Sequence, residues 1–283
     1  MLRARGVRAV LAVLLVLLAG DALAEGVTSF ADRGDLPRAR VLSGFEFLTP
    51  ETKALQQDAF ANPGGLWLDR GERLFAAAEL PTGQSTDENV AAAGRSCASC
   101  HAAEGERPLR GAAIRHPAID ARSGELLNLE GRINACRTRY QQRAPLPYES
   151  DDLLALSAFV ASLSQGMPRR VQVHGAARGF FEQGRAYFFE RKGQLNLACN
   201  QCHDDNWGRW LRGERISQGQ PTAFPGYRLE WQRLGSLHRR LQDCDAGVRA
   251  TRLPAGSPTY VNLELYLAWR AAELPSEAPG VRR

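Results

Sequence analysis

Methionine is scarce in this chain, and long hydrophobic runs are missing. Of the two methionines, Met1 is the first residue, so Met167 is the one left for structure or ligand binding. The apolar run from Ala9 to Ala19 has 11 residues, too few to cross a bilayer as a helix. The sequence therefore argues against a membrane span, and it limits any chemistry that depends on methionine.

The apolar run has the flanks of a secretory signal. Arginines precede it, and Ala22-Leu23-Ala24 follows it as a small-x-small cleavage site. We expect residues 1–24 to be a signal peptide cleaved after Ala24, which places the mature protein in the periplasm. Residues 25–60 carry no motif, so they could either wrap the N-terminal domain or bind a partner.

A strong net charge is also missing. The formal charge of +5 falls to +3 over the 259 residues after the signal, because the signal takes away three arginines and one aspartate. So small a charge excludes a nucleic-acid binder that depends on a large basic field. With 44% hydrophobic and 24% charged residues, the composition is that of a globular protein long enough for two domains.

Six cysteines are present, and their spacing argues against three simple disulfides. Four of them form two C-x-x-C-H motifs, Cys97 to His101 and Cys199 to His203. This is the attachment signature of c-type haem, in which two thiols bond to one macrocycle and the histidine binds its iron. We predict two covalent haem c groups, attached through Cys97, Cys100, Cys199 and Cys202, with His101 and His203 as iron ligands.

A similar order of features follows each motif. Cys136 lies 35 residues after His101, and Cys244 lies 41 residues after His203. We expect each of these cysteines to end a helix, over residues 126–136 and 227–244.

A further helix is expected after each cysteine. Ser150-Asp151-Asp152 and Ser257-Pro258 are typical helix starts. We therefore predict a mainly α fold with two cytochrome c-like haem domains in tandem, residues 25–165 and 166–283. Residues 165–170 contain Gly166 and Pro168 and are expected to form the hinge.

Each iron also needs a sixth ligand or an open position. The candidates are Met167, His116, His174, His238, Cys136 and Cys244. The two cysteines are favoured because they stand in corresponding places after the motifs. The alternative is a disulfide between Cys136 and Cys244. Met167 lies beside Pro168 in the expected hinge, where a connecting role is favoured over ligation.

Arg240 precedes Cys244 by one helical turn and so shares its face of the expected helix. Its guanidinium could lower the pKa of the thiol and hold an oxyanion with two hydrogen bonds. A solvated basic face is the simpler alternative.

At these residues the sequence resembles the dihaem SoxA family, the larger haem subunit of the SoxAX cytochrome of sulfur oxidation. The resemblance is strongest over residues 184–203, 219–232, 239–244 and 265–270. It implies that Cys244 is both an iron ligand and an active-site cysteine that can carry a persulfide. It also implies that Arg240 binds substrate and that Cys136 is a ligand of the first haem.

The resemblance further implies an exported L-cysteine S-thiosulfotransferase that forms a heterodimer with the monohaem cytochrome SoxX. Such an enzyme joins thiosulfate oxidatively to a cysteine of the carrier SoxYZ. Two alternatives stay open. One is a dihaem electron-transfer cytochrome without a catalytic role, and the other is a thiosulfate dehydrogenase that forms tetrathionate.

Overall fold

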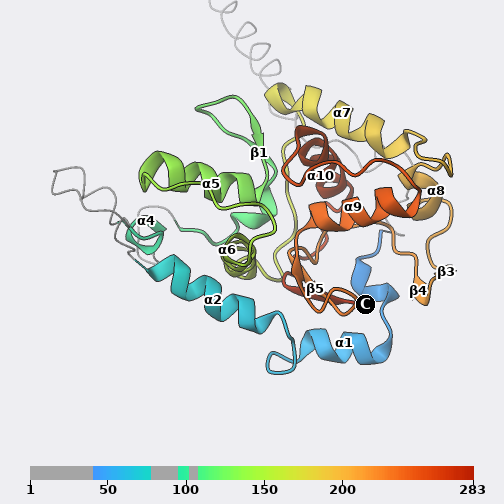
Figure 1. Cartoon of the computed structure of the whole chain (residues 1–283), viewed down its shortest axis with the longest axis horizontal. Helices are drawn as coiled ribbons and strands as arrows, with labels where there is room; N and C mark the ends of the chain where they lie inside the picture. The colour runs from blue at the N-terminus through green and yellow to red at the C-terminus, as the bar shows by residue number, and fades with distance from the viewer. Residues whose placement is uncertain (1–40, 78–94, 102–107) are drawn as a thin grey trace, which may run out of the picture. The chain divides into compact units, whose positions relative to one another are not determined.

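The computed structural model describes residues 41–77, 95–101 and 108–283 (Figure 1). The predicted signal peptide and its cleavage site lie outside these residues. In the described part, helices predominate over short strands, as predicted. The longer helices are α1 (Pro50–Gln57), α2 (Gly65–Ala76), α5 (Leu129–Tyr140), α6 (Asp151–Ser162), α7 (Arg178–Phe189), α9 (Leu237–Gly247) and α10 (Pro258–Arg270). Short helices are α4 (Ala98–His101), α8 (Cys199–His203), η3 (Gly44–Phe47), η4 (Ala113–Arg115) and η5 (Gly175–Ala177).

Two helix pairs are packed through glycine. In α2, a Cβ on Gly71 would lie 2.1 Å from the carbonyl oxygen of Ala155 in α6. In α7, a Cβ on Gly184 would lie 2.0 Å from the carbonyl oxygen of Asn262 in α10. Only glycine allows backbones to approach this closely. In each half of the chain, therefore, the helix before the C-x-x-C-H motif is held against the last helix of that half.

Strands are short and form three small sheets. β1 (Ala118–Ile119) pairs with β2 (Leu126–Leu127), and β3 (Trp210–Leu211) pairs with β4 (Glu214–Arg215), both antiparallel. The third sheet has the order β6-β5-β7, where β5 is Gly226–Arg228, β6 is Arg233–Gly235 and β7 is Gly280–Arg282. β5 is antiparallel to β6 and parallel to β7.

The expected helix over residues 227–244 is wrong in its first half. Residues 226–235 form the β5–β6 hairpin, with Gln232 in the turn at a φ of 52°. The helix α9 begins only at Leu237, where the hydroxyl of Ser236 accepts a hydrogen bond from the backbone of Arg239. Neither α5 nor α9 ends at its cysteine, since α5 continues to Tyr140 and α9 to Gly247.

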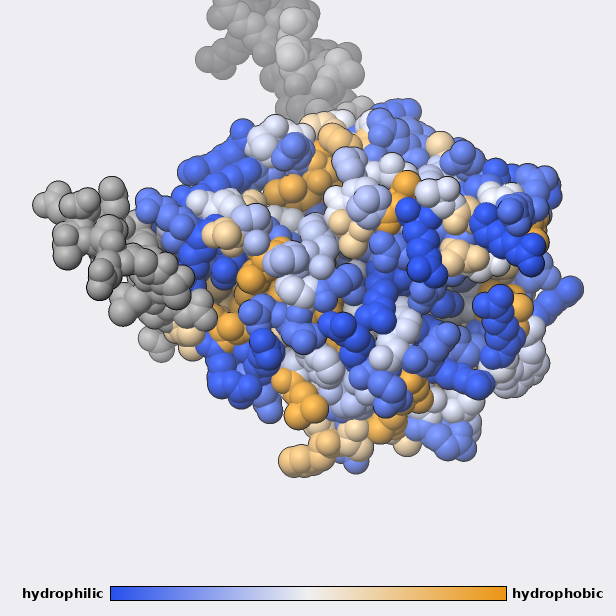
Figure 2. All heavy atoms as spheres, viewed as in Figure 1, coloured by the Kyte–Doolittle hydropathy of each residue, from blue (hydrophilic) through white to orange (hydrophobic). Residues whose placement is uncertain are grey.

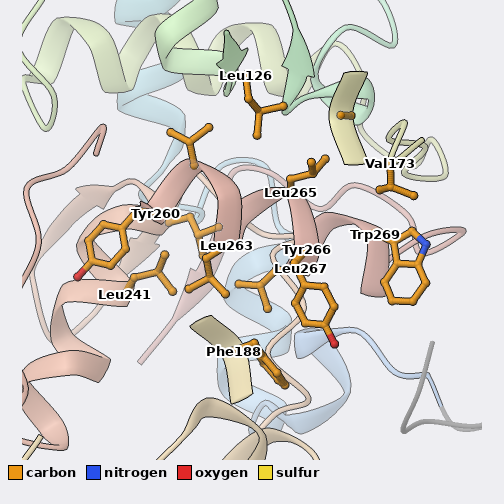
Figure 3. Packing of buried hydrophobic residues seen from close by; sticks show 13 residues of the cluster. Leu126, Val173, Phe188, Leu241, Tyr260, Leu263, Leu265, Tyr266, Leu267 and Trp269 are labelled. Atoms are coloured by element: carbon orange, nitrogen blue, oxygen red, sulfur yellow. The ribbon is translucent and has the colours of Figure 1, made fainter. Parts of the chain in front are cut away.

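The expected helix starts at Ser150 and at Ser257-Pro258 are confirmed. Ser150 caps α6 by accepting from the backbone of Leu153, and Pro258 is the first residue of α10. The largest hydrophobic cluster surrounds α10 (Figure 3). There Leu263, Tyr266 and Trp269 meet Phe188 of α7, Leu241 of α9 and the β2 residue Leu126. Burial of α10 therefore positions the helices that carry the second motif and Cys244.

The segment 165–170 is anchored by backbone hydrogen bonds. Gly166 donates to Ser276, Arg169 to Leu274 and Arg170 to Ile114. Residues 41–283 form one compact unit, and the predicted division at residue 165 stays a prediction.

The segment after residue 40 packs against the C-terminal strand. Gln56 Oε1 accepts from the backbone of Val281 at 2.9 Å, and Asn62 Nδ2 donates to the carbonyl of Pro279 at 3.2 Å. The described residues of the segment 25–60 thus contact β7 of the C-terminal half, a contact that neither expected use included, and binding of a partner there stays a prediction. Within the described ranges, no helix is long and apolar enough to cross a membrane. The face in Figure 2 is mostly hydrophilic, with apolar residues in small separate groups.

Candidate functional site

His203 of the second motif is held in one orientation. Its Nδ1 lies 2.7 Å from the carbonyl oxygen of Ser217, so Nδ1–H donates there and Nε2 is the nitrogen that can bind a metal. Gly219, with a φ of 75°, packs against the ring, since a Cβ on it would lie 3.1 Å from Cγ of His203. An oriented imidazole of this kind fits the proximal ligand of a haem. The roles of Ser217 and Gly219 were missed by sequence reasoning, because neither residue belongs to the C-x-x-C-H motif and their contact with His203 is made through the backbone.

Cys244 faces His203 across the site. Cys244 is half-buried, and its thiol hydrogen-bonds with the His203 side chain. Burial alone would raise its pKa, but the positive charge of Arg240 and the His203 hydrogen bond together lower it below its ordinary value. Cys199 and Cys202 are near enough for their charges to interact with Cys244. The two attachment cysteines, the histidine and Cys244 are therefore brought together.

Arg240 lies beside Cys244, as predicted from the helical spacing. The Cys244 thiolate is the largest influence on Arg240 and raises the pKa of its guanidinium. Among the described residues, Arg240 makes no ion pair and no side-chain hydrogen bond, although Glu214, Glu230 and Asp243 are near enough to act on its charge. A guanidinium with open donors beside a sulfur nucleophile can bind an oxyanion.

Its neighbour Arg239 has a different contact. The guanidinium carbon of Arg239 lies 4.5 Å from the ring centroid of Trp231, and Trp231 Nε1 donates to Asp243 at 2.9 Å. Arg239 is therefore engaged with Trp231, whereas Arg240 lies beside Cys244.

Cys136 lies near the first motif. Its charge interacts with those of Cys97 and Cys100, and Gln141 Nε2 donates to the sulfur of Cys97 at 3.5 Å. All six cysteines are free. The alternative of a Cys136–Cys244 disulfide is wrong, because each of these cysteines lies beside its own motif.

The remaining ligand candidates are engaged elsewhere. His238 Nδ1 accepts from the backbone of Gly256 at 2.8 Å, and its Nε2 lies 3.1 Å from Glu264 Oε2. His116 Nδ1 lies 2.9 Å from the carbonyl of Ala112, while His174 is exposed at the start of η5. Met167 packs over the turn at Gly111, in keeping with a connecting role.

Comparisons with known proteins place these features in a family context. A family model described as the SoxA/TsdA cytochrome c domain matches residues 82–169. The chain is 35% identical over 252 residues to the L-cysteine S-thiosulfotransferase subunit SoxA of Rhodovulum sulfidophilum, covering 89% of this chain and 82% of that protein. The same subunit from Pseudaminobacter salicylatoxidans is 33% identical over 243 residues, which is 86% of this chain and 81% of that one.

A solved structure also matches. The crystal structure of SoxXA from P. pantotrophus aligns with a TM-score of 0.77 at 32% identity, over 86% of this chain and 87% of that chain. The likeness therefore extends over most of the chain in sequence and in fold.

Proposed function

The chain belongs to the SoxA family, and on that basis we propose that it is the haem-bearing subunit of an enzyme that joins thiosulfate to a cysteine of the carrier SoxYZ. The relatives named above are L-cysteine S-thiosulfotransferase subunits, and the cytochrome c domain implies covalently bound haem c. The observation that carries the proposal is the placement of Arg240, with open hydrogen-bond donors, one turn from Cys244.

The proposed reaction forms one sulfur–sulfur bond. The carrier thiolate and the outer sulfur of thiosulfate lose one electron each and become joined, which gives a cysteine S-thiosulfonate and two electrons. A carrier that starts as a thiol also releases one proton. Two one-electron acceptors are required, and we assign them to a haem of this chain and to the haem of a SoxX partner. The match to a SoxXA structure supports that partner.

This chain's own residues bind and orient the reactants. Arg240 holds the sulfonate oxygens with two charge-assisted hydrogen bonds. Arg240 and His203 lower the pKa of Cys244, which favours the thiolate that can exchange with sulfane sulfur and carry it as a persulfide.

Two haem c groups fit the residues present. We assign the first to Cys97 and Cys100, with His101 and Cys136 on its iron, and the second to Cys199 and Cys202, with His203 and Cys244. When bound, each haem supplies a one-electron acceptor. The order of a glycine-packed helix, a motif, a cysteine helix and a last helix occurs twice, which supports the tandem arrangement of residues 25–165 and 166–283. Export to the periplasm after cleavage at Ala24 completes the proposal.

Product analysis tests this function against its alternatives. The complex with SoxX is incubated with SoxYZ, thiosulfate and oxidised cytochrome c, and the carrier mass and free tetrathionate are measured. Cys244→Ser should abolish the carrier adduct, whereas Arg239→Ala should retain most of it. Tetrathionate without a carrier adduct would indicate a thiosulfate dehydrogenase. Full adduct formation by Cys244→Ser would indicate that the chain only transfers electrons.

A further inference from the structure

A small internal cavity of about 30 Å³ lies where α5, α9 and α10 meet. Apolar residues form part of its wall, but five polar side chains also line it. These are Glu130 of α5, Glu264 of α10, His116, Arg169 and Ser276. They come from both halves of the chain, and the function proposed above uses none of them.

The two carboxylates differ in their hydrogen bonds. Glu264 Oε2 accepts from Asn128 Nδ2 at 3.1 Å and lies 3.1 Å from His238 Nε2. His238 Nδ1 accepts from the backbone of Gly256, while His238 Nε2 makes no hydrogen bond among the described residues although it lies close to Glu264. Glu264 therefore has a side-chain donor in Asn128.

Glu130 lacks comparable donors. Among the described residues, no other side chain donates a hydrogen bond to it, and it is 6% exposed. Burial and then the negative charge of Glu264 raise its pKa to about 7. Glu130 can therefore hold a proton near neutral pH.

The cavity also contains donors without partners. Nε of Arg169 and Oγ of Ser276 have no hydrogen-bond partner within the described part of the chain, and the two residues are 6% and 2% exposed. Unpaired buried polar atoms are costly, so they are usually paired with ordered water. A space of about 30 Å³ is large enough for water, since one molecule needs about 10–15 Å³.

The polar cluster formed by Glu130, Glu264 and His238 connects α5 and α9, the helices that carry the proposed iron ligands. Glu130 precedes Cys136 in α5 by six residues, and His238 precedes Cys244 in α9 by six residues. Glu130 and His238 interact electrostatically, and Glu264 lies beside both. A change of charge in the cluster therefore acts at one end of both helices.

We propose that this cavity is a water-containing proton site in which Glu130 takes up a proton as the haem centres of this chain are reduced. The inference rests on the proposed haem placement. An electron added to either centre makes the interior more negative, which raises the affinity of the Glu130 carboxylate for a proton from solvent. The carboxylate becomes a carboxyl, so the added negative charge is neutralised.

Several other groups face Glu130 and set the pH range of this uptake. His238 from α9 favours the anion of Glu130, whereas Glu264 from α10 and Glu149 from the loop before α6 disfavour it. Arg169 and His116 face the same cavity, and the pKa of each is lowered by burial. Tyr148 stacks on His238, and its pKa is raised by burial and by the charges of Glu130 and Glu264.

The test compares midpoint potentials of the haems in the intact complex with SoxX, measured by spectroelectrochemistry from about pH 5 to about pH 9. The potentials of the parent should fall as pH rises through neutrality, and Glu130→Gln should remove this fall. The exposed Glu125→Gln is the matched control and should keep it. Glu264→Gln removes the neighbouring charge and should move the fall to lower pH.

Unfolding by urea gives a second readout that needs no turnover. The folded-state pKa of Glu130 is raised, so the parent should lose stability as pH rises from about 4.5 towards neutrality, and Glu130→Gln should lose less. Potentials that do not vary with pH in the parent, or that vary equally in Glu130→Gln, would overturn the proposal. Neither readout uses thiosulfate, so a failure of the transferase function would be seen separately.

Discussion

Arg240 lies one helical turn before Cys244 in α9, and the Cys244 thiolate is the main influence on its guanidinium. If Arg240 clamps the sulfonate of thiosulfate, Arg240→Ala removes a contact worth about 1.5–3 kcal/mol. The expected loss in kcat/KM is roughly ten- to a hundredfold. Arg240→Lys should recover only part of it, because lysine restores the charge but not the two-pronged geometry. Steady-state kinetics with thiosulfate and the carrier measure both.

Arg239→Ala is the control for this pair. Its guanidinium lies over Trp231, so its removal should cost about 0.5–1 kcal/mol of unfolding free energy and little activity. Equal kinetic losses at Arg239 and Arg240 would indicate a diffuse basic patch that docks the carrier, and the clamp would be abandoned.

Haem attachment gives the second prediction. The mature chain should begin at Glu25 and carry two haem groups, because the signal features and both motifs are complete. Cys202→Ala should impair attachment of the second haem only, since Cys97 and Cys100 are unchanged. Intact mass spectrometry measures the start of the chain and the number of haems. A variant that kept four thioether links would contradict the assignment.

Thiolate ligation is expected at both irons. Cys136 lies by the first motif and Cys244 faces His203, whereas Met167 and His238 are engaged elsewhere. Electron paramagnetic resonance should show low-spin signals typical of histidine/thiolate haem. Cys136→Ser and Cys244→Ser should each remove one set of signals. A sulfur-to-iron charge-transfer band typical of histidine/methionine ligation on both haems would exclude thiolate ligation.

The sequence predicted those parts of the site that depend on local spacing. Both C-x-x-C-H motifs, the Arg240–Cys244 turn and the helix starts at Ser150 and Pro258 are set by residues close together in the chain. The β5–β6 hairpin was missed because the leucines at 229, 234, 237 and 241 match a helical period, while pairing with β7 at residues 280–282 decides the fold there.

Contacts between distant residues could not be predicted from the sequence. The carbonyl of Ser217 and the backbone of Gly219 meet His203 through a loop whose contact with the ring depends on no side chain. One usable signal was overlooked. The sequences Gly71-Glu-Arg-Leu-Phe75 and Gly184-Arg-Ala-Tyr-Phe188 share a glycine and a phenylalanine four residues apart, and both pairs are buried.

Close packing at Gly184 gives the fourth prediction. In Gly184→Ala, the new Cβ would collide with the backbone carbonyl of Asn262, so α7 and α10 must separate. The expected loss of unfolding free energy is about 1–3 kcal/mol, measured by urea titration. Gly179→Ala in the same helix meets no atom within 4 Å and should be neutral or slightly stabilising. Equal losses in the two variants would mean that helix propensity, rather than packing against α10, determines the change in unfolding free energy.

The last prediction concerns acid stability at Asp120, the residue that follows β1. Its carboxylate accepts from Arg132 Nη1 at 2.9 Å and lies 2.6 Å from Arg139 Nη2, and these arginines flank Cys136 in α5. The hydrogen bond with Arg139 is the main cause that holds the pKa of Asp120 well below its ordinary value. Asp120 therefore anchors the helix that carries the proposed ligand of the first haem.

The lowered pKa of Asp120 determines how its contribution to folding stability changes with pH. The unfolded carboxyl titrates near pH 3.9, whereas the folded one stays ionised at lower pH, so the folded state binds fewer protons. The stabilisation is present above about pH 4 and is lost as pH falls further. Urea midpoints at about pH 3 and about pH 7 should therefore differ less in Asp120→Asn than in the parent. Glu125→Gln, which removes an exposed carboxylate five residues later, should behave like the parent. If Asp120→Asn lost as much stability between about pH 7 and about pH 3 as the parent, the loss at acid pH would come from other carboxylates. Asp120 would then have no role in holding α5.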